Sequence, residues 1–121
     1  MTEQLRRELK SQLEQLRDDL QRNLTAQEAE YNELSGAERI EPVDEAQVRM
    51  DSHNREAMRF HDEERLTRVR SALHRMEDGR YGICATCGAE IKENRLRAKP
   101  EALFCVECER RREREGGGAP H

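Results

Sequence analysis

Four cysteines arranged as two C-x-x-C pairs constrain this chain more than any other feature of its sequence. The first pair is Cys84 and Cys87, the second is Cys105 and Cys108, and 17 residues separate the pairs. Each pair can place two sulfurs on one tight turn, so the two pairs offer four thiolates to one tetrahedral zinc ion and leave no open position. Gly88 follows the first pair, where an unusual backbone angle is expected. A structural zinc ion is therefore predicted, with an iron–sulfur cluster, a redox dithiol or paired disulfides as alternatives.

The composition makes such a metal centre important for a stable fold. Of the 121 residues, 34% are hydrophobic and 40% are charged, and the chain has no Trp and only two Phe. So few apolar side chains cannot build a compact core of ordinary size. Small chains of this kind are held together by a metal, by disulfides or by an elongated pair of helices.

Two long stretches that precede the cysteines are predicted to be helices. In residues 3–35 leucines recur at steps of three and four, which is the spacing of a coiled-coil seam. The seam consists of Leu5, Leu9, Leu13, Leu16, Leu20 and Leu24, followed by Tyr31 and Leu34. Residues 45–78 carry the matching seam at Leu66, Val69, Leu73 and Met76, and Met50, Ala57 and Phe60 are expected to continue it. Pairing is expected to be looser in the strongly polar stretch 51–64.

The sequence between these stretches favours an antiparallel helical hairpin. Gly36 and Pro42 interrupt the helical pattern and leave a short connection, so the two helices should fold back on each other. The alternative is one continuous helix that pairs with another chain.

The predicted fold is therefore mainly α, with a long coiled-coil hairpin followed by a small four-cysteine zinc finger and a short C-terminal helix. The expected boundaries are 1–79 for the hairpin, with its tip loop near 36–45, 80–112 for the finger, and 113–121 for a disordered tail.

Several function classes are disfavoured by the sequence. The net charge is −4 with both signs mixed, so the chain lacks the basic face of a protein that binds DNA non-specifically. Residues 1–10 lack the apolar core of a secretory signal and no run of 18 apolar residues could span a membrane, so a cytoplasmic location is expected. His53, His61 and His74 are scattered in a polar helix, and no P-loop, dinucleotide fingerprint or catalytic triad is present, so an enzyme is not expected.

The cysteine region and its flanks resemble the DksA/TraR family of bacterial transcription factors. The resemblance is carried by the stretch from Met76 to Gly88, by Arg95-Leu-Arg-Ala-Lys-Pro100 and by Leu103-Phe-Cys-Val-Glu-Cys108, and it extends over residues 5–112. Members of that family consist of a helical hairpin followed by a four-cysteine zinc finger, in agreement with the fold predicted above.

The resemblance implies a site at the hairpin tip. The family carries an acidic motif of the form Asp-x-x-Asp-x-Ala, and the matching residues here are Glu41, Asp44 and Ala46, with Glu in place of the first Asp. Family members bind RNA polymerase rather than promoter DNA. Their hairpin enters the secondary channel of the enzyme, the tip approaches the active site, and the stability of promoter complexes changes. Asp44 also has a simpler reading as an N-cap of the second helix.

The resemblance further implies a role for the alarmone ppGpp of the stringent response. Arg68 and Lys99 match two basic family positions that contact ppGpp, but Glu109 stands at a third position that is usually basic, and a carboxylate beside phosphates is unfavourable. The sequence therefore leaves open whether the protein needs ppGpp for its function. A transcript-cleavage factor, a zinc or redox sensor and a dimeric coiled-coil adaptor are the alternative functions, whereas the leading hypothesis predicts a monomer.

Overall fold

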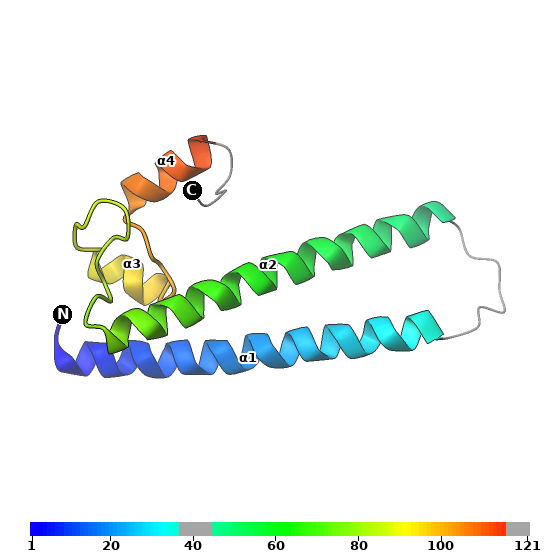
Figure 1. The fold of residues 1–121 in the computed structure, drawn as a ribbon, viewed down its shortest axis with the longest axis horizontal. Coiled ribbons are helices and arrows are strands. Elements are labelled where there is room, and N and C mark those ends of the chain that lie inside the picture. The colour runs from blue at the N-terminus through cyan, green and yellow to red at the C-terminus, as the bar shows by residue number, and fades with distance from the viewer. Residues whose placement is uncertain (37–44, 116–121) are drawn as a thin grey trace.

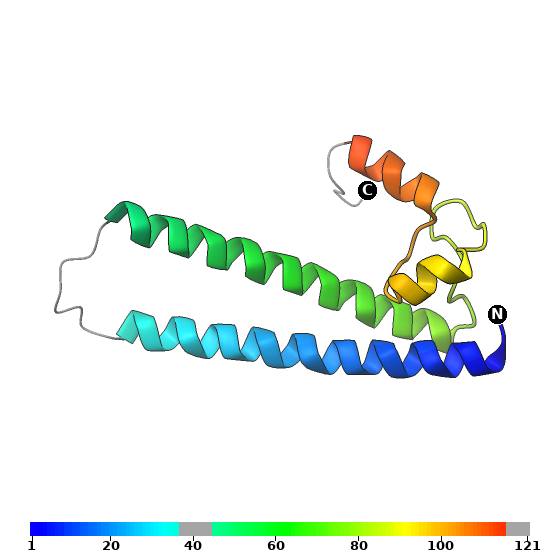
Figure 2. The same cartoon turned by 180° about the vertical axis from the view of Figure 1, so that it is seen from behind.

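The computed structural model describes residues 1–36 and 45–115, without the side chains of residues 31, 34–36, 45–48 and 51. Its helices are α1 (Glu3–Gly36), α2 (Glu45–Glu77), α3 (Glu93–Ala98) and α4 (Val106–Arg114). Figure 1 shows α1 and α2 antiparallel, with α3 and α4 gathered where α1 begins and α2 ends, and Figure 2 shows the same arrangement from behind. Within the described ranges the only β pairing is an isolated bridge between Ile83 and Glu90. The predicted mainly α hairpin with a finger is confirmed, and the alternative of one continuous helix is wrong.

The core of the hairpin is the seam that the leucine spacing predicts. Thr2 opens α1 as its N-cap, because its Oγ1 accepts a hydrogen bond from the Leu5 backbone N–H at 3.1 Å. The buried side chains of α1 are Leu5, Leu9, Leu13 and Leu20, and those of α2 are Leu66, Val69, Ala72 and Met76. Leu16, Leu24 and Leu73 are partly buried against them. Each fully buried Leu, Val or Met side chain stabilises the fold by about 1.5–3 kcal/mol, so the base of the hairpin is its most stable part.

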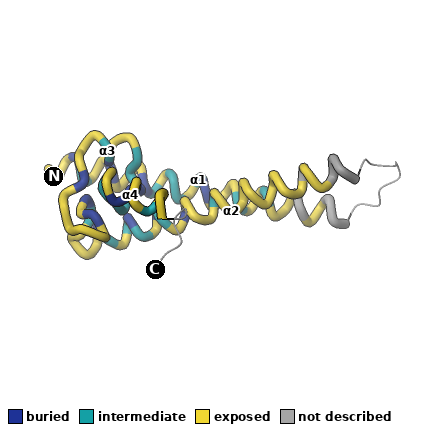
Figure 3. The backbone as a smooth tube through the Cα atoms, turned by 90° about the horizontal axis from the view of Figure 1, so that it is seen from above, coloured by how far each residue is buried: buried dark blue, intermediate teal, exposed yellow. Residues whose placement is uncertain are grey.

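The seam does not extend along α2 as predicted. Met50 and Phe60 each expose 61% of their surface, and Ala57 is also exposed. Phe60 lies nine residues before Val69, which is about two and a half helical turns and therefore the opposite face of α2. Figure 3 shows the buried positions confined to the finger and the half of the hairpin next to it, as the polar composition of 51–64 leads one to expect. A hydrogen bond of 2.8 Å from Gln27 to Asp62 links the two helices in this more polar region.

A glycine ends α2 and turns the chain into the finger. Gly79 has a φ of +73°, its N–H donates to the Met76 carbonyl at 3.2 Å, and the Arg80 N–H donates to the Arg75 carbonyl at 2.8 Å. This pair of bonds is a Schellman motif, which satisfies two carbonyls that the helix end leaves free. The helix therefore stops one residue earlier than predicted.

The finger is attached to the hairpin by apolar packing and by polar side chains. Cys84, Ile91, Leu96 and Cys108 belong to the same buried cluster as the hairpin leucines. Arg75 of α2 donates to the Ile83 carbonyl at 2.8 Å, and Arg97 of α3 lies 3.8 Å from the Glu8 carboxylate of α1. These contacts fix the finger at the base of the hairpin, at the end remote from the tip.

The chain beyond the second cysteine pair is helical for longer than predicted. α4 continues to Arg114, because Glu113 and Arg114 favour a helix and the glycines begin only at Gly116. The rest of the predicted tail, 116–121, lies outside the described residues, as does the tip connection 37–44. None of the described helices combines the length and the apolar character that crossing a bilayer requires.

Candidate metal centre

The four cysteines converge from two separate turns of the finger. The ligand atoms of Cys84, Cys87, Cys105 and Cys108 all lie within 4.8 Å of one another, and the Sγ atoms of Cys87 and Cys105 are 3.8 Å apart. Cys84 and Cys108 are buried, whereas Cys87 is exposed, so the centre lies at the surface of the finger.

Local backbone geometry builds the two turns. In the first, the Gly88 N–H donates to the Cys84 carbonyl at 3.0 Å, and Gly88 has the φ of +76° that its position after the second cysteine predicts. In the second, Cys105 is the N-cap residue of α4, and its carbonyl accepts the Glu109 N–H at 2.9 Å. The two turns are joined by a hydrogen bond of 2.9 Å from the Ala85 N–H to the Leu103 carbonyl.

The electrostatics of the cluster fit a bound dication. Burial opposes ionisation of the Cys84 thiol, but backbone N–H groups of Cys87, Cys105 and Thr86 directed at it lower its pKa to about 6. Hydrogen bonding to the Cys105 sulfur, together with burial and the charge of Cys84, raises the pKa of Cys108 to about 12. Four sulfurs this close cannot all be thiolates unless a cation lies among them, and four thiolates with no open position are the ligands of a structural zinc ion.

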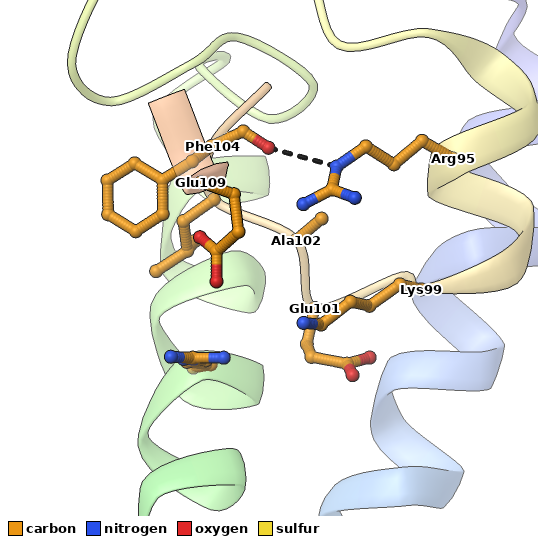
Figure 4. A pocket seen from close by; sticks show the side chains of 8 residues that line it. Arg95, Lys99, Glu101, Ala102, Phe104 and Glu109 are labelled. Atoms are coloured by element: carbon orange, nitrogen blue, oxygen red, sulfur yellow. Dashed lines mark hydrogen bonds between the residues drawn. The ribbon is translucent and has the colours of Figure 1, made fainter. Parts of the chain in front are cut away.

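A small open cleft lies beside the metal centre, between α2 and the finger. Its polar and aromatic lining comes from Arg68, Arg95, Lys99, Glu101, Phe104 and Glu109. Figure 4 shows Glu109 on one side of the cleft and Arg95, Lys99 and Glu101 on the other. Arg95 is held in place by the hydrogen bond from its Nε to the Phe104 carbonyl, at 3.1 Å.

Glu101 is an unusual member of this lining because it is a buried carboxylate. It exposes only 3% of its surface, and its Oε1 lies 3.5 Å from the Nε of Arg65, which is 43% exposed. Among the residues that the structure describes, its Oε2 has no hydrogen-bond partner. The neighbouring Tyr81 phenol donates to the Pro100 carbonyl at 2.8 Å, and burial, reinforced by the charge of Glu101, raises the pKa of Tyr81.

The structure brings together some of the predicted site residues and leaves others outside its described part. The four cysteines form one cluster, and Arg68, Lys99 and Glu109 line one cleft although they come from three separate segments. Glu41 and Asp44 lie outside the described residues. Ala46 lies in the first turn of α2, with its side chain undescribed.

Two charged residues of the cleft were not predicted from the sequence. Arg95 belongs to a conspicuous basic run, Arg95-Leu-Arg-Ala-Lys, that could have indicated it. Glu101 has no such signal, since its burial depends on how the finger packs against Arg65 of α2.

Comparison with known proteins agrees with this geometry. The family described as the prokaryotic dksA/traR C4-type zinc finger matches residues 79–114. The RNA polymerase-binding transcription factor DksA of Escherichia coli (strain K12) is 34% identical over 105 residues, which cover 85% of this chain and 65% of that protein. The chain thus spans slightly under two thirds of the length of this relative.

Two solved structures share the fold. Transcription factor DksA2 from Pseudomonas aeruginosa superposes with a TM-score of 0.71 at 26% identity, covering 95% of this chain and 88% of that one. The RNA polymerase binding protein and transcriptional regulator Dks from Chlamydia trachomatis gives a TM-score of 0.57 at 19% identity, covering 95% and 94%, which is a likeness of fold. With four clustered cysteines that bind one structural zinc ion at the base of a helical hairpin, residues 79–114 of this chain form a zinc finger of the prokaryotic dksA/traR C4 family.

Proposed function

We propose that this protein is a transcription regulator that binds RNA polymerase and acts without catalysing a reaction of its own. The observation that carries the proposal is its 34% identity, over hairpin and finger alike, to an Escherichia coli protein named for binding RNA polymerase. The cytoplasm, where that enzyme works, is the proposed location. A monomer is the proposed state.

In the proposed mechanism the hairpin enters the interior of RNA polymerase. An α1 of 34 residues is about 50 Å long, so it can carry its tip far from the finger. We propose that the arm enters the secondary channel and places Glu41, Asp44 and Ala46 near the polymerase active site. Carboxylates there would interact with the cations and basic groups of that site and so change the stability of promoter complexes.

A binding competition tests the partner and the route together. Zinc-loaded protein is titrated into purified bacterial RNA polymerase, with and without a known secondary-channel factor as competitor. The proposal predicts saturable binding at micromolar concentrations or tighter, and displacement by the competitor. Absence of binding, or binding that the competitor leaves unchanged, would contradict it.

The tip is tested by removing one charge. Asp44→Asn should bind polymerase as tightly as the wild type while losing most of its effect on promoter-complex lifetime, because the arm still enters but its tip lacks the carboxylate. The matched control is Asp18→Asn, which removes an exposed carboxylate from the middle of α1 and should change neither binding nor promoter-complex lifetime. Equal transcriptional activity of wild type and Asp44→Asn would refute the assigned role.

The cleft supports a second element of the proposal, a contact with ppGpp at the interface between regulator and polymerase. Arg68 and Lys99, the two residues that the sequence singles out, lie in one cleft and are both half-buried, which is a suitable setting for phosphate groups. If they contact ppGpp, Arg68→Gln and Lys99→Gln should each reduce the effect of added ppGpp on transcription without reducing polymerase binding in its absence. Unchanged ppGpp responses in both variants would remove this element and leave the channel mechanism in place.

A further inference from the structure

The cleft between α2 and the finger contains charges of both signs that do not neutralise each other in pairs. Arg95 donates to a backbone carbonyl, and Glu101 is 3.5 Å from Arg65, so each of these already has a partner. Within residues 1–36 and 45–115, neither Arg68 nor Lys99 forms an ion pair. Both are half-buried, and a cation withdrawn from water without a counter-charge favours the binding of an anion.

Glu109 opposes this tendency from the other wall. It lies in the first turn of α4, where its N–H bonds the Cys105 carbonyl at 2.9 Å, so the position of its backbone is fixed. Its side chain is half-buried and lines the cleft, facing Lys99 and Glu101 across the open space in Figure 4. No ion pair of Glu109 occurs in the part of the chain that the structure describes. Its negative charge therefore acts on whatever enters the cleft.

We propose that Glu109 determines the specificity of this cleft by weakening its binding of multiply charged anions. Arg68 and Lys99 attract an anion, and Glu109 repels it in proportion to the charge that the anion carries. A dense polyanion such as a diphosphate is penalised most, and a singly charged anion least. The proposal deepens the anion-binding role proposed above for the cleft, and it concerns the chain alone, without polymerase.

The test compares two anions on the zinc-loaded full chain at low ionic strength. Inorganic pyrophosphate serves as the multiply charged probe and dimethyl phosphate as the singly charged one, with binding followed by isothermal titration and by amide chemical shifts. Glu109→Gln should bind pyrophosphate about tenfold more tightly than the wild type, and the gain should shrink as added salt screens the charges. The affinity for dimethyl phosphate should change by about twofold or less.

A neighbouring glutamate provides the matched control. Glu107 lies in the same first turn of α4 and next to the same cysteine, but it is exposed and does not line the cleft. Glu107→Gln should leave pyrophosphate affinity unchanged. In the Glu109→Gln background, Arg68→Gln should abolish the gain, which locates it in the cleft. Zinc content and thermal unfolding establish that each variant is folded, and Glu109→Ala should repeat the gain.

Three outcomes would overturn the proposal. They are equal pyrophosphate affinity in wild type and Glu109→Gln, an equal gain in Glu107→Gln, and the absence of saturable binding in every variant. A chain that shows the gain but fails to bind polymerase would retain the specificity role of Glu109 and lose the proposed function, so the two failures are distinguishable.

Discussion

Gly88 shows how the backbone of one residue contributes to the zinc centre. Its φ of +76° lies in the left-handed region, and no atom lies within 4 Å of the place where a Cβ would be added. A side chain here would therefore meet no neighbour, and only the backbone preference opposes it. The glycine is needed because its N–H must reach the Cys84 carbonyl, which closes the turn that carries two of the four sulfurs.

Gly88→Ala should accordingly weaken the finger by about 1–2 kcal/mol, the cost of placing an L-residue in the left-handed region. Zinc competition with a chelator and thermal unfolding of the zinc-loaded protein would measure the loss. Gly88→Asn should lose less, because asparagine tolerates this conformation better than alanine. An alanine variant as stable as the wild type, or an asparagine variant that is worse than alanine, would contradict the backbone explanation.

The position of an individual residue in the fold could be predicted from the sequence where it depends only on spacing between neighbouring residues. The C-x-x-C pairs predict that four sulfurs meet, since each pair shares one turn. The burial of Glu101 was not predictable, because it depends on Arg65, which is 36 residues away in the sequence. A carboxylate after a proline has no pattern that distinguishes it from a solvated surface residue.

At the scale of the helices, the stability of the hairpin is concentrated at its base. Leu13 has no exposed surface, whereas Met58, on the part of α2 beyond the buried seam, exposes 61%. Leu13→Ala should therefore destabilise the protein by about 2–5 kcal/mol, through lost burial and the cavity left behind. Met58→Ala should change stability by no more than about 0.5 kcal/mol, as surface substitutions usually do. Denaturant unfolding of both variants would test this.

Similar losses in the two variants would mean that the outer half of the hairpin is packed as firmly as its base, contrary to the burial pattern.

The period of the leucines predicted α1 to within one residue, and Gly79 predicted the end of α2 equally well. The prediction that Phe60 belongs to the seam was wrong because it considered only that Phe60 is hydrophobic and not on which face of the helix it lies. Phe60 is nine residues from Val69, so it lies on the opposite face of α2.

At the scale of the whole molecule, the zinc finger and the hairpin share one apolar core but differ in what holds them. The hairpin helices have 34 and 33 residues, and α3 and α4 have six and nine. Such short helices are not stable alone, so the finger depends on its metal. The hairpin depends on leucine packing instead.

Removal of zinc by a chelator should therefore unfold the finger and leave most of the helix signal. Far-ultraviolet circular dichroism should retain the larger part of its amplitude, because α1 and α2 contain most of the helical residues. Limited proteolysis should then cut within 79–114 first. Complete loss of the helix signal, or continued protection of the finger without zinc, would show that the metal plays a different part.

The finger lies at one end of the hairpin, and the end of α1 and the start of α2 lie at the other, which gives the proposed mechanism its geometry. In that proposed mechanism the finger would remain outside the polymerase while the hairpin reaches inward, so different parts of the chain should contact different parts of the enzyme. The sequence predicts both ends of the arm, but the cleft at its base arises only when α2, α3 and α4 pack together.

Site-specific photo-crosslinking to RNA polymerase tests this central claim most directly. A photoreactive side chain is placed at Ala46, in the first turn of α2 beside the tip, and in a second variant at Arg114, at the end of α4. We predict that the probe at position 46 crosslinks to polymerase segments around the active site, and that the probe at position 114 crosslinks only to the outer surface. Crosslinks from position 46 to the outer surface alone, or the absence of crosslinks from both positions, would contradict the entry of the hairpin into the channel.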